Sequence, residues 1–438
     1  MIYQEFIAWL EEVPLYGHKD GTNNIRKLMH RLGDPQKHFR TIHVAGTNGK
    51  GSCCAMLQGI LQSAGYKTGL FTSPHLVSYT ERIRVDKQEI SEEDFVRIGL
   101  VVKSEIEAMV RDGENHCTFF EILTAMGFLF FAEQNIDICV LETGVGGRLD
   151  ATNIVEPPEL ILTLITSISL DHTKVLGDTL TAIAGEKAGI LRPGIPVVLA
   201  QNPGEVRETV KSMAQSIGAP FYGTEEKDLV MLDNERKRQN LPALKTPLAG
   251  DYQKQNLAAV LCCIRLLRET LEIPDEALLI GLEETRWPGR MDFRLWHGRT
   301  LLLDGAHNPG GAMMLRRFLE NNCPDSSCVL LFSALGKKDV TGILRELGEC
   351  RAIRQAVITA IHGEDNLDWF AEIWNQTCPD KPCAQVPQLE DAMALACRLA
   401  DGQGENEQKP GLVVCAGSLY LIGDILKVLD GGRSNKNV

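Results

Sequence analysis

The chain has 438 residues, of which 44% are hydrophobic and 24% charged, and its formal net charge is −13. This composition is typical of a globular protein with two or three domains. An acidic chain lacks the basic footprint of nucleic-acid-binding proteins, so no nucleic-acid partner is expected. No secretory signal is visible, the apolar run Ile122 to Ala132 is shorter than the ~20 residues that span a bilayer, and the 13 cysteines match no zinc or redox spacing. We therefore expect a cytoplasmic protein with reduced thiols and no membrane segment.

The first part of the chain alternates short apolar strands with helices. A helix is predicted over residues 52–63, and strands are predicted at residues 41–45, 68–71, 136–141, 160–166 and 196–200. Strands that are almost entirely apolar and alternate with helices indicate a mostly parallel sheet that is covered on both faces.

The pattern restarts after Trp287-Pro288-Gly289-Arg290. A helix is predicted over residues 311–320, and strands are predicted at residues 301–303, 329–332, 356–359 and 412–415. The predicted fold class is therefore α/β. It consists of a mostly parallel P-loop domain over residues 1–295 and a smaller, Rossmann-like C-terminal domain over residues 296–438.

A glycine-rich segment, Gly46-Thr47-Asn48-Gly49-Lys50-Gly51-Ser52, connects the first predicted strand to the first long helix. A strand, a glycine-rich turn and a helix together form an anion site, because backbone N–H groups and the helix N-terminus point at the anion. The loop departs from the G-x-x-x-x-G-K-[ST] pattern, since Val44 replaces the first glycine and Gly51 separates Lys50 from Ser52. ATP phosphates are the expected ligand, and a tight turn is the alternative.

Polar residues follow the other strands of the predicted first domain. Ser73 follows the second strand, Glu142 the third, and Asp171-His172 the fourth. Ligands collect at the carboxyl ends of parallel strands, and oxygen ligands suit Mg²⁺. Taken singly, Glu142 could cap a helix, Asp171 could hold a turn and His172 could be an ordinary loop histidine.

These segments resemble a known family. Val44 to Ser52 is similar to the signature of the folylpolyglutamate synthases within the Mur ligase superfamily, and the two departures from the general pattern are that family's own. Further blocks resemble the family in the same order along the chain: Thr72-Ser73-Pro74-His75-Leu76, Glu81-Arg82-Ile83-Arg84, Leu141 to Asn153, Leu170-Asp171-His172-Thr173, Ile183 to Ile190, Asp304 to Pro309 and Gly417-Ser418-Leu419-Tyr420. The resemblance covers nearly the whole chain.

The resemblance implies roles for single residues. Thr47, Asn48, Gly49, Lys50, Gly51 and Ser52 would hold the ATP phosphates. Ser73 and Glu142 would bind one Mg²⁺, and His172 a second. Lys187 matches a lysine that is carbamylated in the family, although the sequence alone favours an ordinary helix lysine or a salt-bridge partner. On the nucleotide, Asn256 would contact the adenine, and Arg290, Asp304 and His307 would come from the second domain.

For a pterin acceptor, the family suggests His75, the segment Thr118, Phe119, Phe120 and Glu121, and the segment Leu149, Asp150 and Ala151. The two phenylalanines could stack on a pterin ring or could simply belong to the core. Arg148 to Ala151 and Pro74-His75 are more similar to the members that act on both dihydropteroate and folates.

The implied enzyme is an ATP-dependent acid–amino-acid ligase, a dihydrofolate synthase or folylpolyglutamate synthase. It would add L-glutamate to dihydropteroate or to the glutamyl tail of reduced folates through an acyl phosphate, with Lys50, Lys187 and His172 at the reacting groups. A monofunctional folylpolyglutamate synthase, another Mur-type amide ligase, a P-loop kinase or NTPase, and a non-catalytic nucleotide-binding module are the alternatives. The family suggests a monomer. The second domain is expected to swing in and complete the site.

Overall fold

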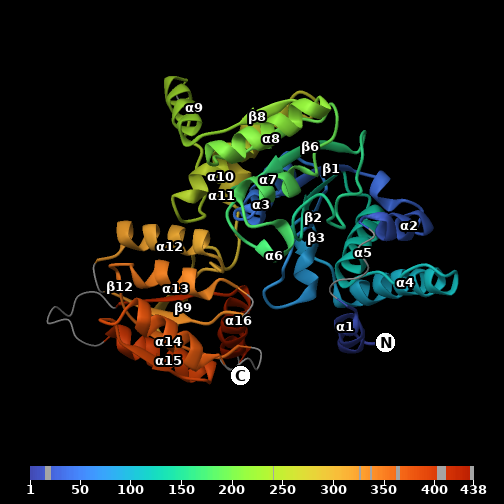
Figure 1. Cartoon of the computed structure of the whole chain (residues 1–438). Coiled ribbons are helices and arrows are strands. Elements are labelled where there is room, and N and C mark those ends of the chain that lie inside the picture. The colour runs from blue at the N-terminus through green and yellow to red at the C-terminus, as the bar shows by residue number, and fades with distance from the viewer. Residues whose placement is uncertain are drawn as a thin grey trace. The chain divides into compact units, whose positions relative to one another are not determined.

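The structure is a computed structural model, and it describes residues 1–14, 21–239, 241–324, 327–335, 338–361, 366–401 and 411–434. The chain forms two compact units. The first comprises Met1–Pro247 and Gln253–Thr285, and the second comprises Leu248–Tyr252 and Arg286–Val438. Figure 1 shows the first unit in blue to yellow and the second mainly in orange and red.

The first unit is built on an eight-stranded sheet with the order β4-β3-β2-β5-β1-β6-β7-β8. Strands β2 to β3 and β3 to β4 pair antiparallel, and all other neighbours are parallel. The strands are β1 (Arg40–Ala45), β2 (Thr68–Phe71), β3 (Ile83–Val85), β4 (Gln88–Glu89), β5 (Ile138–Glu142), β6 (Leu160–Ile165), β7 (Val197–Leu199) and β8 (Phe221–Gly223).

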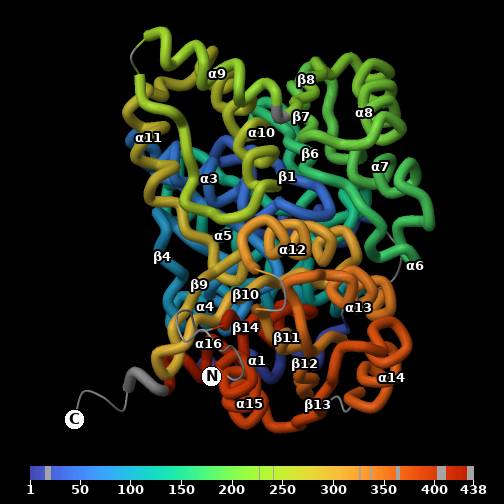
Figure 2. The backbone as a smooth tube through the Cα atoms, turned by 90° about the vertical axis from the view of Figure 1, so that its left-hand side faces the viewer, coloured from blue at the N-terminus to red at the C-terminus, as the bar shows by residue number. Residues whose placement is uncertain are grey.

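Helices cover both faces of this sheet, as its apolar strands require. Helix α3 follows β1, contacts β1, β2 and β5, and packs on α11, and Figure 2 shows α3 near α10 and α11. Helices α4 and α5 join β4 to β5, while α7 and α8 join β6 to β8. The helices are α1 (Tyr3–Glu12), α2 (Asn23–Arg31), α3 (Lys50–Ser63), α4 (Glu92–Arg111), α5 (Phe119–Glu133), α6 (Thr173–Leu176), α7 (Leu180–Ala188), α8 (Gly204–Ile217), α9 (Glu226–Arg238), α10 (Tyr252–Leu267) and α11 (Asp275–Glu283), with 3-10 turns at Pro35–Lys37 and Tyr79–Arg82.

The register of the central strands decides which polar residues meet. Val44 of β1 is opposite Glu142 of β5, and Ala45 is opposite Ile165 of β6. On the other side of β5, Phe71 of β2 is opposite Leu141. The residues that follow β1, β2, β5 and β6 therefore emerge at one edge of the sheet.

The second unit has a six-stranded sheet with the order β13-β12-β11-β14-β10-β9, and among its described strands only β9 and β10 pair antiparallel. Its core includes Leu330, Phe332 and Trp374, all fully buried. The strands are β9 (Asp292–Trp296), β10 (Arg299–Leu303), β11 (Cys328–Phe332), β12 (Ile353–Ile358), β13 (Cys383–Gln385) and β14 (Leu412–Ala416). The helices are α12 (Pro309–Asn322), α13 (Val340–Gly348), α14 (Leu367–Thr377), α15 (Leu389–Asp401) and α16 (Leu419–Ser434).

The α/β class and the mostly parallel sheets are confirmed. Strands β3, β4, β8, β9 and β13 were not predicted, and they lie at or near the sheet edges. The compact units divide after Thr285, so the boundary expected at residue 295 falls inside β9; as a domain limit it stays a prediction. Among the described residues, no helix has both the length and the apolar character that crossing a membrane requires.

Candidate active site

Two glycines give the loop after β1 its conformation. Gly46 has φ +147° and Gly49 has φ +89°, which are values that other residues rarely adopt. A Cβ atom at Gly46 would overlap the Thr166 hydroxyl, and one at Gly49 would lie 2.5 Å from Asn256 Oδ1. Glycine is therefore needed at both positions for space as well as for φ.

The Lys50 ammonium lies over this loop. Its Nζ donates to the carbonyl oxygens of Gly46 (3.2 Å) and Thr47 (3.4 Å), and it lies 3.7 Å from Glu142 Oε1. The Lys50 side chain is only 15% exposed. A cation in this position, at the N-terminus of α3, suits an anionic phosphate chain.

The loop is held on the β6 side by Thr47 and Asn48. The Thr47 and Asn48 N–H groups donate to the Ser167 carbonyl (2.8 and 3.2 Å), and Thr47 Oγ1 and Asn48 Nδ2 donate to Ser169 O and Oγ (3.2 and 3.0 Å). The sequence did not single out Ser169. The only available signal was its place just after a predicted strand, two residues before Asp171.

Ser52 belongs to a buried network with α10. Gln253 Nε2 donates to Ser52 Oγ (3.2 Å), and Asn256 Nδ2 donates to Gln253 Oε1 (2.9 Å). All three side chains are at most 4% exposed. Asn256 therefore lies against Gly49. Gln253 joins the site, although the sequence did not reveal its role.

Glu142 and Ser73 meet at the ends of β5 and β2. The Ser73 N–H group donates to Glu142 Oε2 (3.2 Å), and the carboxylate is 4% exposed. Its contacts with Ser73 and Lys50 are made at the ends of the strands. The Glu142 carboxylate and the Ser73 hydroxyl are oxygen donors of the kind that Mg²⁺ prefers.

Lys187 is 4% exposed, so it is not an ordinary surface lysine of α7. Its Nζ donates to the Gly46 carbonyl at 2.7 Å, directly beneath the phosphate loop. Burial, and in second place the charge of Lys50, lowers the pKa of Lys187 to about 7. This lowering favours the neutral amine more than at an exposed lysine.

His172 lies in the turn before α6 with φ +49°, and its side chain is 38% exposed. Asp171 Oδ1 accepts from the His172 N–H group (2.8 Å). His172 Nε2 is 3.9 Å from the same oxygen. Within the described ranges, no three His, Cys, Asp or Glu side chains gather as a ready metal cluster.

Thr118 and Glu121 form the N-terminal cap of α5. The Glu121 carboxylate accepts from Thr118 N (2.7 Å) and Oγ1 (2.9 Å), and the Glu121 N–H group donates to Thr118 Oγ1 (3.4 Å). This capping box is a structural role that the sequence pattern T-x-x-E could have indicated.

Phe119, Phe120 and His75 lie in an aromatic cluster. Phe119 contacts Tyr79 edge to face, with ring centroids 6.0 Å apart, and Phe120 packs on Phe71 at 5.9 Å. Arg82 lies over the Phe119 ring and donates to His75 Nδ1 at 2.9 Å. Both phenylalanines are half-buried, so each has a face in the core as well as an exposed part.

Asp150 organises the loop after β5. Its Oδ2 accepts from the N–H groups of Gly144 (3.0 Å) and Val145 (2.9 Å). Burial raises the pKa of Asp150, and hydrogen bonds from Thr152 and from backbone N–H groups oppose that rise. Leu149 is 55% exposed and Ala151 is buried, so of this segment Leu149 is the side chain most open to a ligand.

In the second unit, Arg290, Asp304 and His307 lie around the end of β10. The buried Asp304 carboxylate accepts from the N–H groups of Met291 and Ala306 (both 2.9 Å). Burial raises its pKa, and the charge of Arg290 opposes the rise. His307 Nδ1 lies 2.8 Å from the Gly305 carbonyl.

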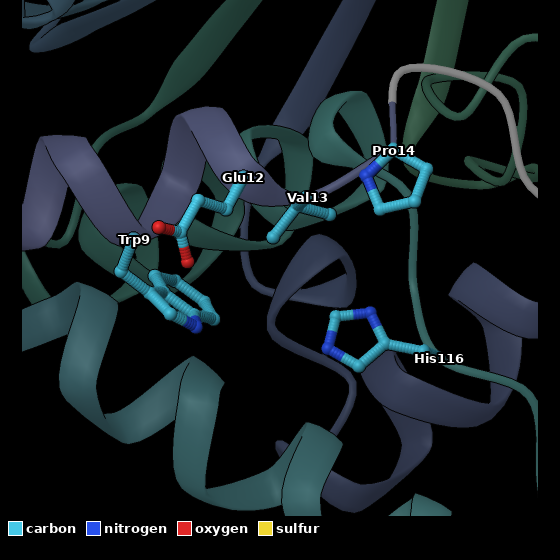
Figure 3. A pocket seen from close by; sticks show the side chains of 5 residues that line it. All are labelled: Trp9, Glu12, Val13, Pro14 and His116. Carbon is cyan, nitrogen blue, oxygen red and sulfur yellow. The ribbon is translucent and has the colours of Figure 1, made fainter.

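A separate hollow of about 250 Å³ lies beside α1. Figure 3 shows the residues that line it: Trp9, Glu12, Val13, Pro14 and His116. None of them is among the predicted site residues. The Pro14 carbonyl accepts from the Phe119 N–H group at 3.2 Å, so this hollow borders the start of α5 rather than the phosphate loop.

The loop, the buried carboxylate and the sheet topology define the class of protein. Residues 44–264 match the Mur ligase middle domain family, and residues 294–428 match the dihydrofolate synthetase C-terminal domain family. This is the ATP-dependent ligase class that the sequence predicted.

Relatives of known function narrow the class. Dihydrofolate synthase/folylpolyglutamate synthase from Bacillus subtilis is 36% identical, with 98% of this chain and 99% of that protein covered. Dihydrofolate synthetase from Saccharomyces cerevisiae is 32% identical over 93% of this chain and 97% of that one. The chain belongs to the dihydrofolate synthase/folylpolyglutamate synthase family.

Solved structures agree. Mycobacterium tuberculosis folylpolyglutamate synthase, complexed with ADP and AMPPCP, gives a TM-score of 0.85 at 27% identity, with 97% of this chain and 98% of that chain covered. E. coli FolC in complex with DHPP and ADP gives a TM-score of 0.83 at 27% identity, with 99% of each chain covered. The family and fold that the sequence indicated are thus confirmed, and ATP is the nucleotide of this ligase class.

Proposed function

We propose that this enzyme joins L-glutamate to dihydropteroate, to the glutamyl tail of reduced folates, or to both. The observation that carries the proposal is the meeting of Lys50, Glu142 and Lys187 at one edge of the sheet, around the carbonyl of Gly46. Such a site suits transfer of the γ-phosphoryl group of ATP to a carboxylate. The names of the relatives support a pterin acid as that carboxylate and glutamate as the amine.

The reaction needs ATP because a carboxylate does not react with an amine. The acceptor carboxylate attacks the γ-phosphorus, which gives an acyl phosphate and ADP. The amine of glutamate then attacks the acyl carbon, and phosphate leaves as the amide forms. The γ-phosphoryl step depends on positioning and charge neutralisation, which Lys50 and the backbone N–H groups of the loop provide.

Magnesium is part of the proposal. Ser73 and Glu142 would hold one Mg²⁺, and His172 and a modified Lys187 a second. Bound Mg²⁺ would neutralise charge on the phosphates. We propose that Lys187 is carbamylated: its neutral amine would attack CO₂ and lose a proton, and the product carries two oxygen ligands in place of a cation.

The remaining predicted residues keep their proposed roles. Thr47 to Ser52 shape the phosphate cradle. Asn256 contacts the adenine or, as its bond to Gln253 favours, supports the loop. His75, Thr118 to Glu121 and Leu149 to Ala151 form the acceptor site, and Arg290, Asp304 and His307 act on the nucleotide from the second unit. These assignments, and the monomeric state, are proposals.

The test is glutamate-dependent ADP release. With ATP, Mg²⁺, glutamate and dihydropteroate, we expect ADP and a product that is heavier by one glutamyl unit. Lys50→Ala should abolish turnover while the protein stays folded. Absence of ADP with every pteroate and folate acceptor would refute the proposal, and near-normal activity of Lys50→Ala would refute the role of the loop.

The acceptor range needs a separate measurement. The sequence of Arg148 to Ala151 favours the dual activity, and the B. subtilis relative carries both names. We expect turnover with dihydropteroate and with tetrahydrofolate. Turnover with tetrahydrofolate alone would identify the alternative, a monofunctional folylpolyglutamate synthase.

A further inference from the structure

A histidine that has no assigned role lies directly below the proposed acceptor loop. His43 is in the middle of β1, between Ile42 and Val44, and it is 1% exposed. Its Nε2 lies 2.8 Å from Thr152 Oγ1, on the loop that follows β5. The chain between the two residues is more than a hundred residues long, so only the folded sheet brings them together.

The hydrogen bond between Thr152 and Asp150 determines which group donates in the bond between His43 and Thr152. Thr152 Oγ1 donates its single proton to Asp150 Oδ1, at 2.5 Å. The same hydroxyl can then only accept from His43, so His43 carries its proton on Nε2. In this buried chain of hydrogen bonds, His43 Nε2–H donates to the Thr152 hydroxyl, and the Thr152 hydroxyl donates to the Asp150 carboxylate.

Asp150 connects Thr152 to the backbone of the loop through further hydrogen bonds. Oδ1 also accepts from the Thr152 N–H group (3.0 Å), and Oδ2 accepts from the Gly144 and Val145 N–H groups. Gly144 is two residues after Glu142, and Leu149 and Ala151 flank Asp150. Because β1 ends in the phosphate loop at Gly46, a single strand supports both the nucleotide site and the loop proposed for the acceptor.

We propose that His43 is a positioning residue for the pterin acceptor, which it serves by fixing Thr152 and Asp150 and with them the loop 144–152. The inference rests on the proposed function, since it takes Leu149 to Ala151 as acceptor residues. His43 does not touch the substrate and transfers no proton in the reaction. It provides one rigid N–H donor under the loop.

A role in packing alone does not account for the residue. His43 is fully enclosed in the sheet, and an aliphatic side chain would fill the site without the cost of burying an imidazole. Burial lowers the pKa of His43 to about 3, and the charge of Arg192 acts in the same direction. The ring is therefore neutral at working pH and holds one tautomer, as a fixed donor must.

The kinetic test compares donor-keeping and donor-lacking variants of the full enzyme. His43→Gln retains an N–H group at similar reach, and His43→Leu has none. We expect His43→Leu to raise the KM for the pterin acceptor by about 10-fold or more while the KM for ATP changes less than about 2-fold. His43→Gln should have a KM for the pterin acceptor close to that of the wild type. In the same way, Thr152→Val should raise this KM, whereas Thr152→Ser, which keeps the hydroxyl, should not.

Two outcomes of this comparison would overturn the inference. One is an equal rise in both KM values for His43→Leu, which is the result of general damage to the sheet. The other is a folded His43→Gln enzyme that is no better than His43→Leu.

A substrate-free measurement separates this inference from the proposed function. In enzyme with ¹⁵N-labelled histidine, we expect the His43 resonances of the neutral Nε2–H tautomer, and loss of that signal in His43→Gln. If the wild type releases no ADP with any pterin acid, the proposed function fails and the acceptor role fails with it. If turnover is normal and His43 carries its proton on Nδ1, the inference alone fails.

Discussion

Burial changes the chemistry of several ionisable side chains in the first unit. Lys187 has its pKa lowered to about 7 and His43 to about 3, because the charged form of each loses its hydration. Glu142, in contrast, keeps an opposite charge beside it, since Lys50 Nζ is 3.7 Å away. The site thus combines the Lys50 ammonium, the neighbouring Glu142 carboxylate and the Lys187 amine, whose pKa is lowered.

The amine is the group on which the proposed second metal depends. We expect Lys187→Met to lower kcat by about 10- to 100-fold, because it would remove the proposed carbamate and with it the proposed metal contact. Lys187→Arg is the matched comparison, since it keeps a cation that cannot be carbamylated. Its kcat should fall as far as that of Lys187→Met. A ¹³C carbamate signal after labelling with bicarbonate should be present in the wild type and absent in both variants. Wild-type turnover by Lys187→Arg would contradict the assignment.

The lowered pKa of His43 predicts how the free energy of unfolding depends on pH. The unfolded chain binds a proton at this histidine below its ordinary pKa of about 6.5, whereas the folded chain binds it only near pH 3. Between these values the unfolded state binds more protons, so the free energy of unfolding falls as the pH falls, by up to about 1.4 kcal/mol per pH unit. His43→Gln should have a shallower slope in denaturant titrations from pH 6.5 to pH 4. Parallel slopes for the two proteins would argue against a neutral, buried histidine.

At the scale of elements, β1, the loop after it and α3 form one functional unit. The predicted strand at residues 41–45 and helix at residues 52–63 correspond to β1 and α3, but α3 begins at Lys50, two residues earlier. The loop is therefore shorter than the sequence implied, and Lys50 is the first residue of the helix. Strands β4, β8 and β13, of two or three residues each, escaped prediction because such short segments carry no periodic pattern.

The conformation of this loop yields a prediction about its glycines. In Gly46→Ala the added methyl group would overlap Thr166, and in Gly49→Ala it would meet the Asn256 amide at a positive φ. We expect both variants to lose at least about 10-fold in ATP affinity, measured by calorimetry, with a change in melting temperature of only a few degrees. Gly185→Ala in α7 is the control, because outside its chain neighbours and the backbone of its own helix no atom of the described residues lies within 4 Å of the added Cβ. Unchanged affinity in Gly46→Ala would show that the loop does not hold the phosphates.

At the scale of the whole molecule, the two units have separate cores. Leu164 is fully buried in the first sheet, and Leu330 in the second. Units with their own cores unfold as separate cooperative transitions unless they are tightly coupled. We expect each substitution to destabilise one unit. Leu330→Ala should lower the midpoint temperature of one calorimetric transition and Leu164→Ala that of the other, and each should reduce the free energy of unfolding of its unit by about 2–5 kcal/mol. An ATP analogue should raise the transition that Leu164→Ala lowers. A single transition that responds to both substitutions would contradict this independence.

The sequence by itself determined the α/β class, the positions of the main strands along the chain, the phosphate loop and the family. These features are local or contiguous, so periodicity and motif spacing report them directly. Only the tertiary structure decided that Lys187 is buried against Gly46, that Gln253 holds Ser52, and that His43 reaches Thr152. Each of these contacts joins segments that lie more than a hundred residues apart. Burial, and with it the pKa and the partner of a side chain, depends on what packs around it in space, and no pattern of neighbours along the chain contains that information.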